Sequence, residues 1–224
     1  MFRRKNSTLL HLKPPTPVKK FLLVDDHFVV RSGMHGLLTE IFMPCEVHEA
    51  NNGESAIEKL KEDTYDLIIM DIQMPNTDTL GFMEYIHTRY PQARVLIYSM
   101  SAENIYAKRF LKAGAKGFIS KDALLEEIKK AINLILNGRK YVSESFAQSL
   151  AEESFTNNSN PFNKLSSREF EIFTLLISGQ PIKEISKILN INTSTVGTHK
   201  ARLLEKLSVS NILELKELAN SYNL

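Results

Sequence analysis

The sequence predicts an α/β protein in which a doubly wound, five-stranded parallel sheet is followed by a small all-α domain. Three observations predict this fold class. From residue 20 to about residue 137, short apolar runs alternate five times with stretches of helical period. Between residues 138 and 161 the alternation weakens and polar residues accumulate. After residue 161 only the helical period remains. Five βα units in ~120 residues are typical of an open sheet with helices on both faces.

The first apolar run, residues 21–24, ends in Asp25 and Asp26, as expected of a central strand buried on both faces of a parallel sheet. Apolar residues from Val30 to Ile41 then recur at helical spacing. The later strands are expected at 46–49, 65–70, 94–98 and 117–119. The helices that follow them are expected at 54–61, 80–89, 103–112 and 124–135.

Four short helices are expected in the C-terminal part. Ser166 lies three residues before Glu169 in a capping-box pattern, and Gly179 is the expected stop of that helix. The next helices are expected at 182–189, 196–207 and 212–219, with Thr193 or Ser194 as the cap of the middle one. Four helices joined by short turns in ~60 residues are consistent with a helix-turn-helix domain.

These patterns divide the chain into four parts. We expect residues 1–19 to form a flexible basic leader whose end is marked by Pro14, Pro15 and Pro17. Residues 20–137 form the sheet domain and residues 162–224 the helical domain. Between them, residues 138–161 are expected to be a linker, with one short helix over about 143–153.

The composition excludes several classes of protein. Hydrophobic residues make up 43% of the chain and charged residues 24%, which argues against fibrous repeats and wholesale disorder. The single cysteine, Cys45, excludes an intramolecular disulfide framework and a multi-cysteine zinc site. No apolar run approaches the ~18 residues of a membrane-spanning helix. We therefore expect a soluble, cytoplasmic protein without a membrane partner.

Charge is unevenly distributed along the chain. Residues 1–20 contain six Lys and Arg residues and no acid, whereas residues 21–160 contain 14 basic and 20 acidic residues. Residues 161–224 contain eight basic and six acidic residues. An acidic body with basic ends indicates parts with different partners, a cation for one and a polyanion for the other.

Polar side chains are predicted to converge at the carboxyl edge of the sheet, where ligands collect in doubly wound folds. Asp25 and Asp26 end the first strand, Asp71 the third, Ser99 the fourth and Lys121 the fifth. Three converging carboxylates would repel one another. The arrangement therefore calls for a hard cation with oxygen ligands, and Mg²⁺ fits it better than zinc.

Such a site is suited to phosphoryl transfer. A carboxylate beside Mg²⁺ can attack a phosphoryl group and form an acyl phosphate, while the metal and an ammonium neutralise its oxygens. Lys121 would supply the ammonium, and Ser99 could turn inward to donate to a phosphoryl oxygen. Taken singly, each of these residues has a plain alternative as a turn or cap residue at a strand end. Their placement on successive strand ends favours the shared site.

At this point the chain resembles the receiver domain of two-component response regulators. The matching segments are Asp25-Asp26-His27 with Arg31-Ser32-Gly33, and residues 50–56, 70–75 and 113–122. The resemblance covers residues 20–137 in order and implies a flavodoxin-like fold. Its departure from the family pattern is Thr79, because Asp78 is usually followed by glycine there. Glycine tolerates φ > 0 and threonine does not readily, so we expect the loop after Asp71 to run differently.

The resemblance also implies roles for individual residues. Asp71 would be the phosphoacceptor and Lys121 would bridge to the phosphoryl group, with Ser99 and Phe118 as the switch pair. From its spacing alone, Phe118 is equally well explained as core packing on the fifth strand. The implied Mg²⁺ ligands are Asp25, Asp26, Asp71 and the main-chain carbonyl of Gln73.

Residues 162–222 resemble the LuxR-type helix-turn-helix, on segments 165–169, 179–185, 195–200 and 205–209. Together the two domains resemble a whole NarL/FixJ-type response regulator. A recognition helix needs one apolar face for its own domain and one polar face for the major groove. Val196, Leu203 and Leu207 supply the apolar face. The expected DNA-contacting residues are Lys183, Thr195, Thr198, His199, Lys200, Arg202 and Lys206.

Plain alternatives stay open for these residues. The basic side chains could form an ordinary solvated face, and His199 could be a capping or packing histidine. Gly197 departs from the family pattern, which commonly has lysine at that place, so a base-reading side chain is absent there. Glycine inside a helix also costs ~1 kcal/mol relative to alanine.

The sequence thus predicts a DNA-binding response regulator that accepts a phosphoryl group from a sensor histidine kinase on Asp71 and controls transcription. We expect a homodimer on double-stranded DNA, and the sequence leaves open whether phosphorylation releases the helical domain or drives dimerisation. Two alternatives remain. One is a phosphorylation-independent DNA-binding regulator with a protein-gated receiver. The other is a phosphatase with Asp71 as nucleophile, which is disfavoured because Gln73 stands where a second aspartate would act.

Overall fold

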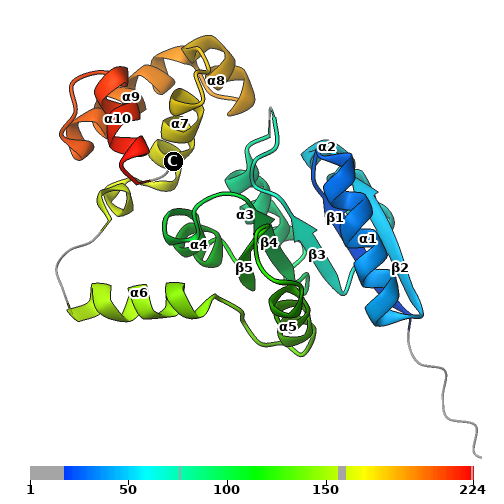
Figure 1. Cartoon of the computed structure of the whole chain (residues 1–224). Helices are drawn as coiled ribbons and strands as arrows, with labels where there is room; N and C mark the ends of the chain where they lie inside the picture. Colours follow the sequence, from blue (N-terminus) through cyan, green and yellow to red (C-terminus); the bar gives the residue numbers. More distant parts are fainter. Residues whose placement is uncertain (1–17, 76, 156–159, 223) are drawn as a thin grey trace, which may run out of the picture.

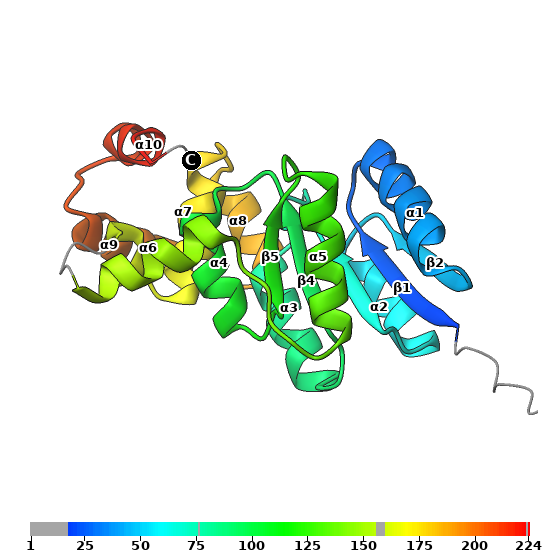
Figure 2. The same ribbon diagram turned by 60° about the horizontal axis from the view of Figure 1, so that its bottom comes forward.

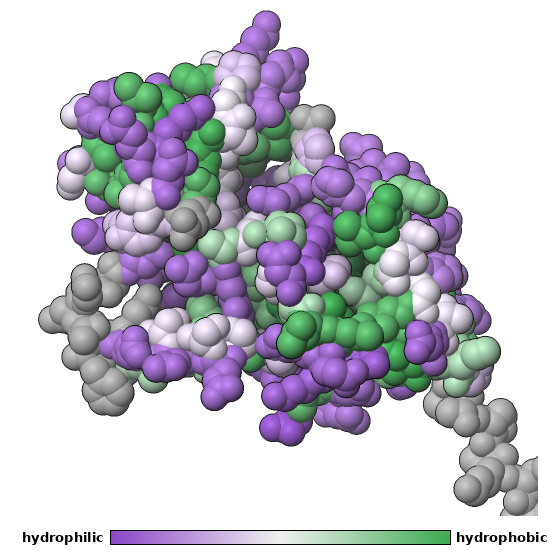
Figure 3. All heavy atoms as spheres, viewed as in Figure 1, coloured by the Kyte–Doolittle hydropathy of each residue, from purple (hydrophilic) through white to green (hydrophobic). Residues whose placement is uncertain are grey.

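The computed structural model describes residues 18–75, 77–155, 160–222 and 224. The predicted leader lies almost wholly outside the described residues, and its last residue, Lys19, is already the first residue of β1. Among the described residues, no helix is long and apolar enough to cross a lipid bilayer. Polar side chains cover most of the face shown in Figure 3.

The sheet domain contains five parallel strands: β1 (Lys19–Val24), β2 (Cys45–Ala50), β3 (Leu67–Met70), β4 (Val95–Ser99) and β5 (Gly117–Ser120). Their order in the sheet is β2-β1-β3-β4-β5 (Figure 1), which is the order of flavodoxin-like doubly wound sheets and confirms the predicted fold class. In the register, Val24 lies opposite both Ala50 and Met70. The residues that follow β1 and β3 therefore leave the sheet side by side.

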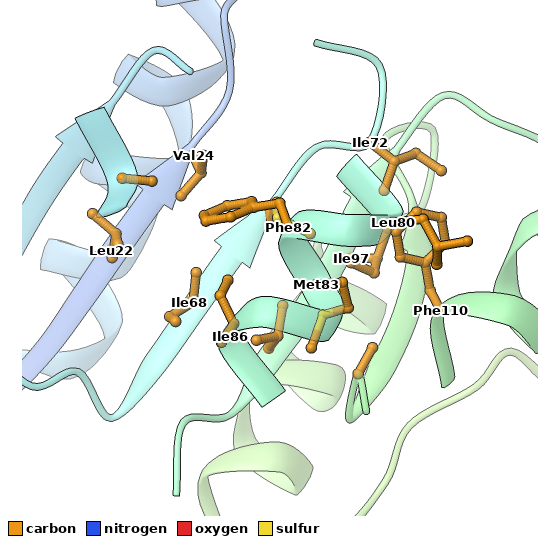
Figure 4. Close-up of a cluster of buried hydrophobic side chains, with 14 of the residues drawn as sticks. Leu22, Val24, Ile68, Ile72, Leu80, Phe82, Met83, Ile86, Ile97 and Phe110 are labelled. Carbon is orange, nitrogen blue, oxygen red and sulfur yellow. The ribbon is translucent and has the colours of Figure 1, made fainter. Parts of the chain in front are cut away.

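Five helices cover the two faces of the sheet: α1 (Phe28–Phe42), α2 (Gly53–Glu62), α3 (Thr79–Arg89), α4 (Glu103–Lys112) and α5 (Leu125–Leu136). Alternate residues of β1 point to opposite faces. Leu22 and Val24 join a core with α2, α3 and α4, whereas Phe21 and Leu23 join a core with α1 and α5. In the first core, side chains of α3 such as Phe82 and Ile86 lie over the sheet (Figure 4). Burial on both faces explains the continuous apolar runs in the sequence.

One predicted strand began too early. Residues 65–70 were expected to be extended, but β3 begins at Leu67. Tyr65 instead turns its ring to β2, where its hydroxyl lies 2.8 Å from Nδ1 of His48. The apolar pattern includes Tyr65 because the ring is buried, although its backbone lies outside the ladder.

The segment predicted as a linker is packed against the sheet domain over much of its length. Tyr141 forms an isolated bridge with Gly117 and is 4% exposed. The predicted short helix is present as α6 (Glu144–Phe155), which runs beside α4 (Figure 2). Ser143, just before α6, donates from Oγ to Glu103 of α4 over 2.5 Å, and Phe146 is buried in the first core.

The C-terminal domain consists of η1 (Pro161–Lys164), α7 (Ser167–Ile177), α8 (Ile182–Ile188), α9 (Thr193–Leu207) and α10 (Ile212–Asn220). The capping box of Ser166 and Glu169 is confirmed, as is Gly179, whose φ of 87° ends α7. The predicted cap of α9 was wrong. Asn192 is the N-cap, because its carbonyl accepts the first helical bond from Val196 at 3.0 Å, and its side chain makes no capping bond.

The two domains touch through α4, η1 and α7. Nη1 of Arg109 on α4 donates to the carbonyl of Leu165 over 3.0 Å, and Nη2 donates to the carbonyl of Phe162. The same guanidinium lies over the ring of Phe170, 4.0 Å from its centroid. The ring of Tyr106 packs edge-on against Phe170, with 5.3 Å between the centroids. These contacts join α4 to the start of the helical domain.

Candidate functional site

Two buried aspartates form the base of the site at the carboxyl edge of the sheet. Asp25 and Asp71 follow β1 and β3, and they are 5% and 3% exposed. The N–H of Asp71 donates to the carbonyl of Val24 over 2.8 Å, and that of Asp25 donates to Ala50 over 3.1 Å. Because the ladder continues into both residues, the sheet fixes the two carboxylates next to each other.

Lys121, one residue after β5, joins the two carboxylates. Its Nζ lies 2.6 Å from Oδ2 of Asp25 and 2.7 Å from Oδ2 of Asp71. Burial alone would lower the pKa of this ammonium, but the hydrogen bonds and charges of both aspartates raise the pKa of Lys121 above its usual value. Lys121 is therefore a fixed positive charge in the site.

The other oxygen of Asp71 receives three donors. Oγ of Ser99 lies 2.6 Å from Oδ1, and the backbone N–H groups of Ile72 and Gln73 donate to it over 2.6 Å and 3.0 Å. Ser99 is fully buried at the end of β4. Contacts to both of its oxygens thus orient the carboxylate of Asp71, and its role as the phosphoacceptor stays a prediction.

Asp26 and His27 complete the cluster. Oδ1 of Asp26 is buried without a hydrogen-bond partner, and it lies 3.0 Å from Nδ1 of His27. Asp25, Asp26, His27 and Asp71 each offer one ligand atom, and these atoms lie within 4.8 Å of one another. A set dominated by carboxylate oxygens fits a divalent cation, as the buried Asp26 oxygen that accepts no hydrogen bond also indicates. His27 was not predicted as part of this set.

Phe118 is fully buried on β5, where it lies opposite Ile97 of β4 in the register. It packs in the same core as α3 and α4. This position satisfies the plain explanation of core packing. A switch role for Phe118 with Ser99 stays a prediction, as does the metal contact of the Gln73 carbonyl.

The departure at Thr79 has a structural role in the loop that follows Asp71. Asp78 is the N-cap of α3 and accepts from the N–H of Gly81 over 2.9 Å, so Thr79 is the first residue of the helix. The hydroxyl of Thr79 donates to the carbonyl of Ile72 over 3.1 Å. Threonine at this place thus ties the start of α3 to the residue next to Asp71, and Thr79 itself has no positive φ that would require glycine.

The helix-turn-helix pair is formed by α8 and α9. The turn between them contains Asn190 in a left-handed conformation (φ 49°), and the N–H of Ile191 donates to the backbone carbonyl of Ser186 over 3.0 Å. Val196, Leu203 and Leu207 are buried on one face of α9, as predicted. Of the predicted DNA-contacting residues, the exposed ones are Lys183, Thr198, Arg202 and Lys206, and the half-buried ones are Thr195, His199 and Lys200.

Two of these residues, Lys206 and His199, have polar atoms that lie against their own domain. Nζ of Lys206 lies 2.6 Å from Oε2 of Glu169, whose carboxylate is buried and also completes the capping box of α7. Nδ1 of His199 is buried without a hydrogen-bond partner. At Gly197 an added Cβ would meet no atom within 4 Å, so nothing in the domain requires glycine there.

A parallel sheet with a lysine between buried aspartates at its carboxyl edge, joined to a helix-turn-helix domain, defines the class of response regulators. Comparison with known families agrees. Residues 21–133 match the response regulator receiver domain, and residues 163–219 match the LuxR family of bacterial regulatory proteins.

The chain is 36% identical over 202 residues to the response regulator GacA of Pseudomonas syringae, which covers 89% of this chain and 94% of GacA. It is 32% identical to the response regulator UvrY of Escherichia coli, over 91% of this chain and 94% of UvrY. The solved structure of RcsB from Salmonella typhimurium shares the fold, with a TM-score of 0.77 at 23% identity over 92% of this chain and 98% of that one. The chain belongs to the NarL/FixJ family of two-component response regulators, which confirms the predicted fold, family and regulatory function.

Proposed function

We propose that the protein accepts a phosphoryl group on Asp71 from a sensor histidine kinase. The observation that carries the proposal is the environment of this carboxylate, with Lys121 at 2.7 Å from one oxygen and Ser99 at 2.6 Å from the other. In the transfer, a carboxylate oxygen forms a bond to phosphorus while the bond from phosphorus to the kinase histidine breaks. Lys121 then neutralises the added charge, because its ammonium already lies between Asp71 and Asp25.

Mg²⁺ is the proposed cofactor. Asp25, Asp26, Asp71 and the main-chain carbonyl of Gln73 would hold it, and when bound it would neutralise the charge on the phosphoryl oxygens. The hydroxyl of Ser99 now donates to Asp71, so phosphorylation would release it to bind a phosphoryl oxygen. Phe118 on the neighbouring strand β5 would repack with it as the switch partner.

For the helical domain, the proposal places α9 in the major groove of double-stranded DNA. Thr195, Thr198, His199, Lys200 and Arg202 would face the bases, and Lys183 and Lys206 would contact phosphates. Lys206 would then share its ammonium between DNA and Glu169. Two-fold symmetric DNA sites favour a homodimer. A solved structure of RcsB, which shares the fold of this chain, contains RcsB dimers bound to DNA.

In this scheme residues 20–137 are the receiver, residues 138–161 join the domains, and residues 162–224 bind DNA in the cytoplasm. The protein is not a turnover enzyme, and the only phosphoryl chemistry proposed beyond acceptance is the hydrolysis of its own aspartyl phosphate. The contacts of Asp71 support the receiver part of this scheme, and the buried apolar face of α9 supports the DNA-binding part.

Incubation with Mg²⁺ and acetyl phosphate tests the proposal on the wild type and on Asp71→Asn. Intact mass is measured first, and DNA-binding selection then follows on the same samples. A phosphoryl adduct on the wild type alone, together with tighter DNA binding, is the expected result. Retained sequence-selective DNA binding without an adduct would instead support the protein-gated alternative. Release of phosphate far beyond one equivalent would support the phosphatase.

A further inference from the structure

His27 stands at the mouth of the acidic site and is held there by its own backbone. It is the N-cap residue of α1, directly after Asp25 and Asp26. The backbone N–H of His27 donates to Oδ1 of Asp25 over 2.8 Å. The imidazole is 62% exposed, so solvent ions reach it freely, while its position relative to the carboxylates is set by the turn from β1 to α1.

The ring points one nitrogen at the carboxylates. Nδ1 lies 3.2 Å from Oδ1 of Asp25 and 3.0 Å from Oδ1 of Asp26. The oxygen of Asp26 is buried and has no hydrogen-bond partner. With Asp71, these residues offer four ligand atoms within 4.8 Å of one another. The protein therefore presents a nitrogen ligand together with the three carboxylates of the proposed Mg²⁺ site.

A nitrogen ligand changes which ions such a site prefers. Mg²⁺ takes oxygen ligands and keeps several of its waters, so an imidazole adds little to its binding. First-row transition-metal ions gain from imidazole, and their affinity rises from Mn²⁺ through Co²⁺ along the usual order. Removing the imidazole should therefore weaken the binding of Mn²⁺ and Co²⁺ and leave Mg²⁺ nearly unchanged.

We propose that His27 is a fourth protein ligand of this site through Nδ1, and that it makes the site selective for transition-metal dications over Mg²⁺. This inference rests on the proposed metal site. It assigns to His27 a specificity role, because the three carboxylates alone would favour a hard cation.

Isothermal titration of the full chain with Mn²⁺, Co²⁺ and Mg²⁺ tests the proposal on the wild type, His27→Ala and His27→Gln. Both variants should bind Mn²⁺ and Co²⁺ about tenfold or more weakly, whereas their Mg²⁺ affinity should stay within about twofold. The matched control is His35→Ala, because His35 lies on α1, the helix that His27 precedes, is 46% exposed and pairs with Glu49 at 3.1 Å, outside the cluster. The control should leave all three affinities unchanged.

Electron spin-echo spectroscopy of bound Mn²⁺ gives a second readout. Wild type and His35→Ala should show nitrogen modulation from a coordinated imidazole, and His27→Ala should lack it. Absence of that modulation in the wild type, or an equal loss of Mg²⁺ affinity in His27→Ala, would overturn the inference. Phosphorylation of Asp71 with Mg²⁺ would still support the proposed function in that case. If neither Mg²⁺ nor Mn²⁺ binds, both proposals fail.

Discussion

At the scale of single residues, Lys121 prevents two buried carboxylates from repelling each other. Its side chain is 9% exposed, and those of Asp25 and Asp71 are 7% and 2% exposed. Water can therefore screen little of the repulsion between the two aspartates. Lys121 therefore contributes to folding as well as to the proposed chemistry, because its ammonium pairs with both carboxylates.

Lys121→Met should lower the free energy of unfolding by about 3 kcal/mol in the absence of divalent ions, because it leaves buried charges without a partner. Mg²⁺ should restore part of the loss by binding between the same carboxylates. Urea unfolding with and without Mg²⁺ measures both effects. Lys129→Met is the control, since Lys129 pairs with a Glu126 side chain that is 83% exposed, and it should change stability by less than about 0.5 kcal/mol. Equal effects of the two variants would contradict the prediction.

At the scale of elements, two glycines of the helical domain differ in what their backbones require. Gly197 lies inside α9 with no positive φ, and an added Cβ would meet nothing within 4 Å. Gly179 ends α7 with a φ of 87°, where side chains are strained. The same substitution should therefore have opposite effects at the two positions.

Gly197→Ala should stabilise the protein by about 0.5–1 kcal/mol, because alanine restricts the unfolded chain and suits a helix interior. Gly179→Ala should destabilise it by about 1 kcal/mol or more, because alanine is strained in the left-handed region. Urea unfolding of the two variants beside the wild type measures both changes. A loss of stability in Gly197→Ala would show that α9 has a contact at this position that depends on glycine.

The elements also show how far the sequence determines the fold. The strand ends were predictable because an apolar run followed by aspartate marks where a buried strand leaves the sheet, as at Asp25 and Asp71. The cap of α9 was not, because Asn192, Thr193 and Ser194 are all residue types that cap helices. Only the backbone conformation distinguishes them.

The candidate site was predictable in the same uneven way. Asp25, Asp71 and Lys121 each follow a strand and Ser99 is the last residue of β4, so topology brings them together whatever their rotamers. The direction in which a side chain points could not be predicted from the sequence in this way. His27 follows two aspartates in the sequence, but spacing alone does not show that Nδ1 faces both of them.

At the scale of the whole molecule, Arg109 holds the two domains together. It lies on α4 and donates to carbonyls of the helical domain that are more than fifty residues away in the sequence, which is why no local pattern predicted the contact. Burial lowers the pKa of Arg109 to about 10, which leaves it charged at neutral pH. Thr198 and Arg202 of α9 stay exposed in this arrangement, so the contact between the domains coexists with an accessible recognition helix.

Arg109→Ala should separate the domains, because it removes two hydrogen bonds and the stacking on Phe170 together. Small-angle X-ray scattering of the unphosphorylated chain should show a larger radius of gyration for this variant. Lys112→Ala is the matched control, because Lys112 is exposed on the same helix. An unchanged scattering curve for Arg109→Ala would mean that the remaining contacts, such as Tyr106 with Phe170, hold the domains together.

A second contact between the domains should make stability depend on pH. Glu171 of α7 has a side chain that is 12% exposed and accepts from Nη1 of Arg168 over 2.8 Å, and Arg168 also lies 3.4 Å from Asp78 of the loop after Asp71. Burial, together with the negative charge of Asp78, raises the pKa of Glu171 to about 8, although Arg168 opposes the change. A protonated Glu171 therefore fits this contact between the domains, because an ionised Glu171 would face the negative charge of Asp78.

The direction in which stability changes with pH follows from the protonation of Glu171 in the folded and the unfolded chain. The unfolded chain loses this proton near its ordinary pKa of 4.5, whereas the folded chain keeps it to about 8. Over that interval the folded state holds more protons, so its stability falls as the pH rises. Glu171→Gln, which stays neutral, should unfold with a shallower pH dependence between about pH 4.5 and about pH 8 in urea titrations. Glu184→Gln on α8, where the side chain is 44% exposed, should keep the wild-type slope. If both variants keep that slope, Glu171 is ionised in the folded protein and the contact tolerates two facing carboxylates.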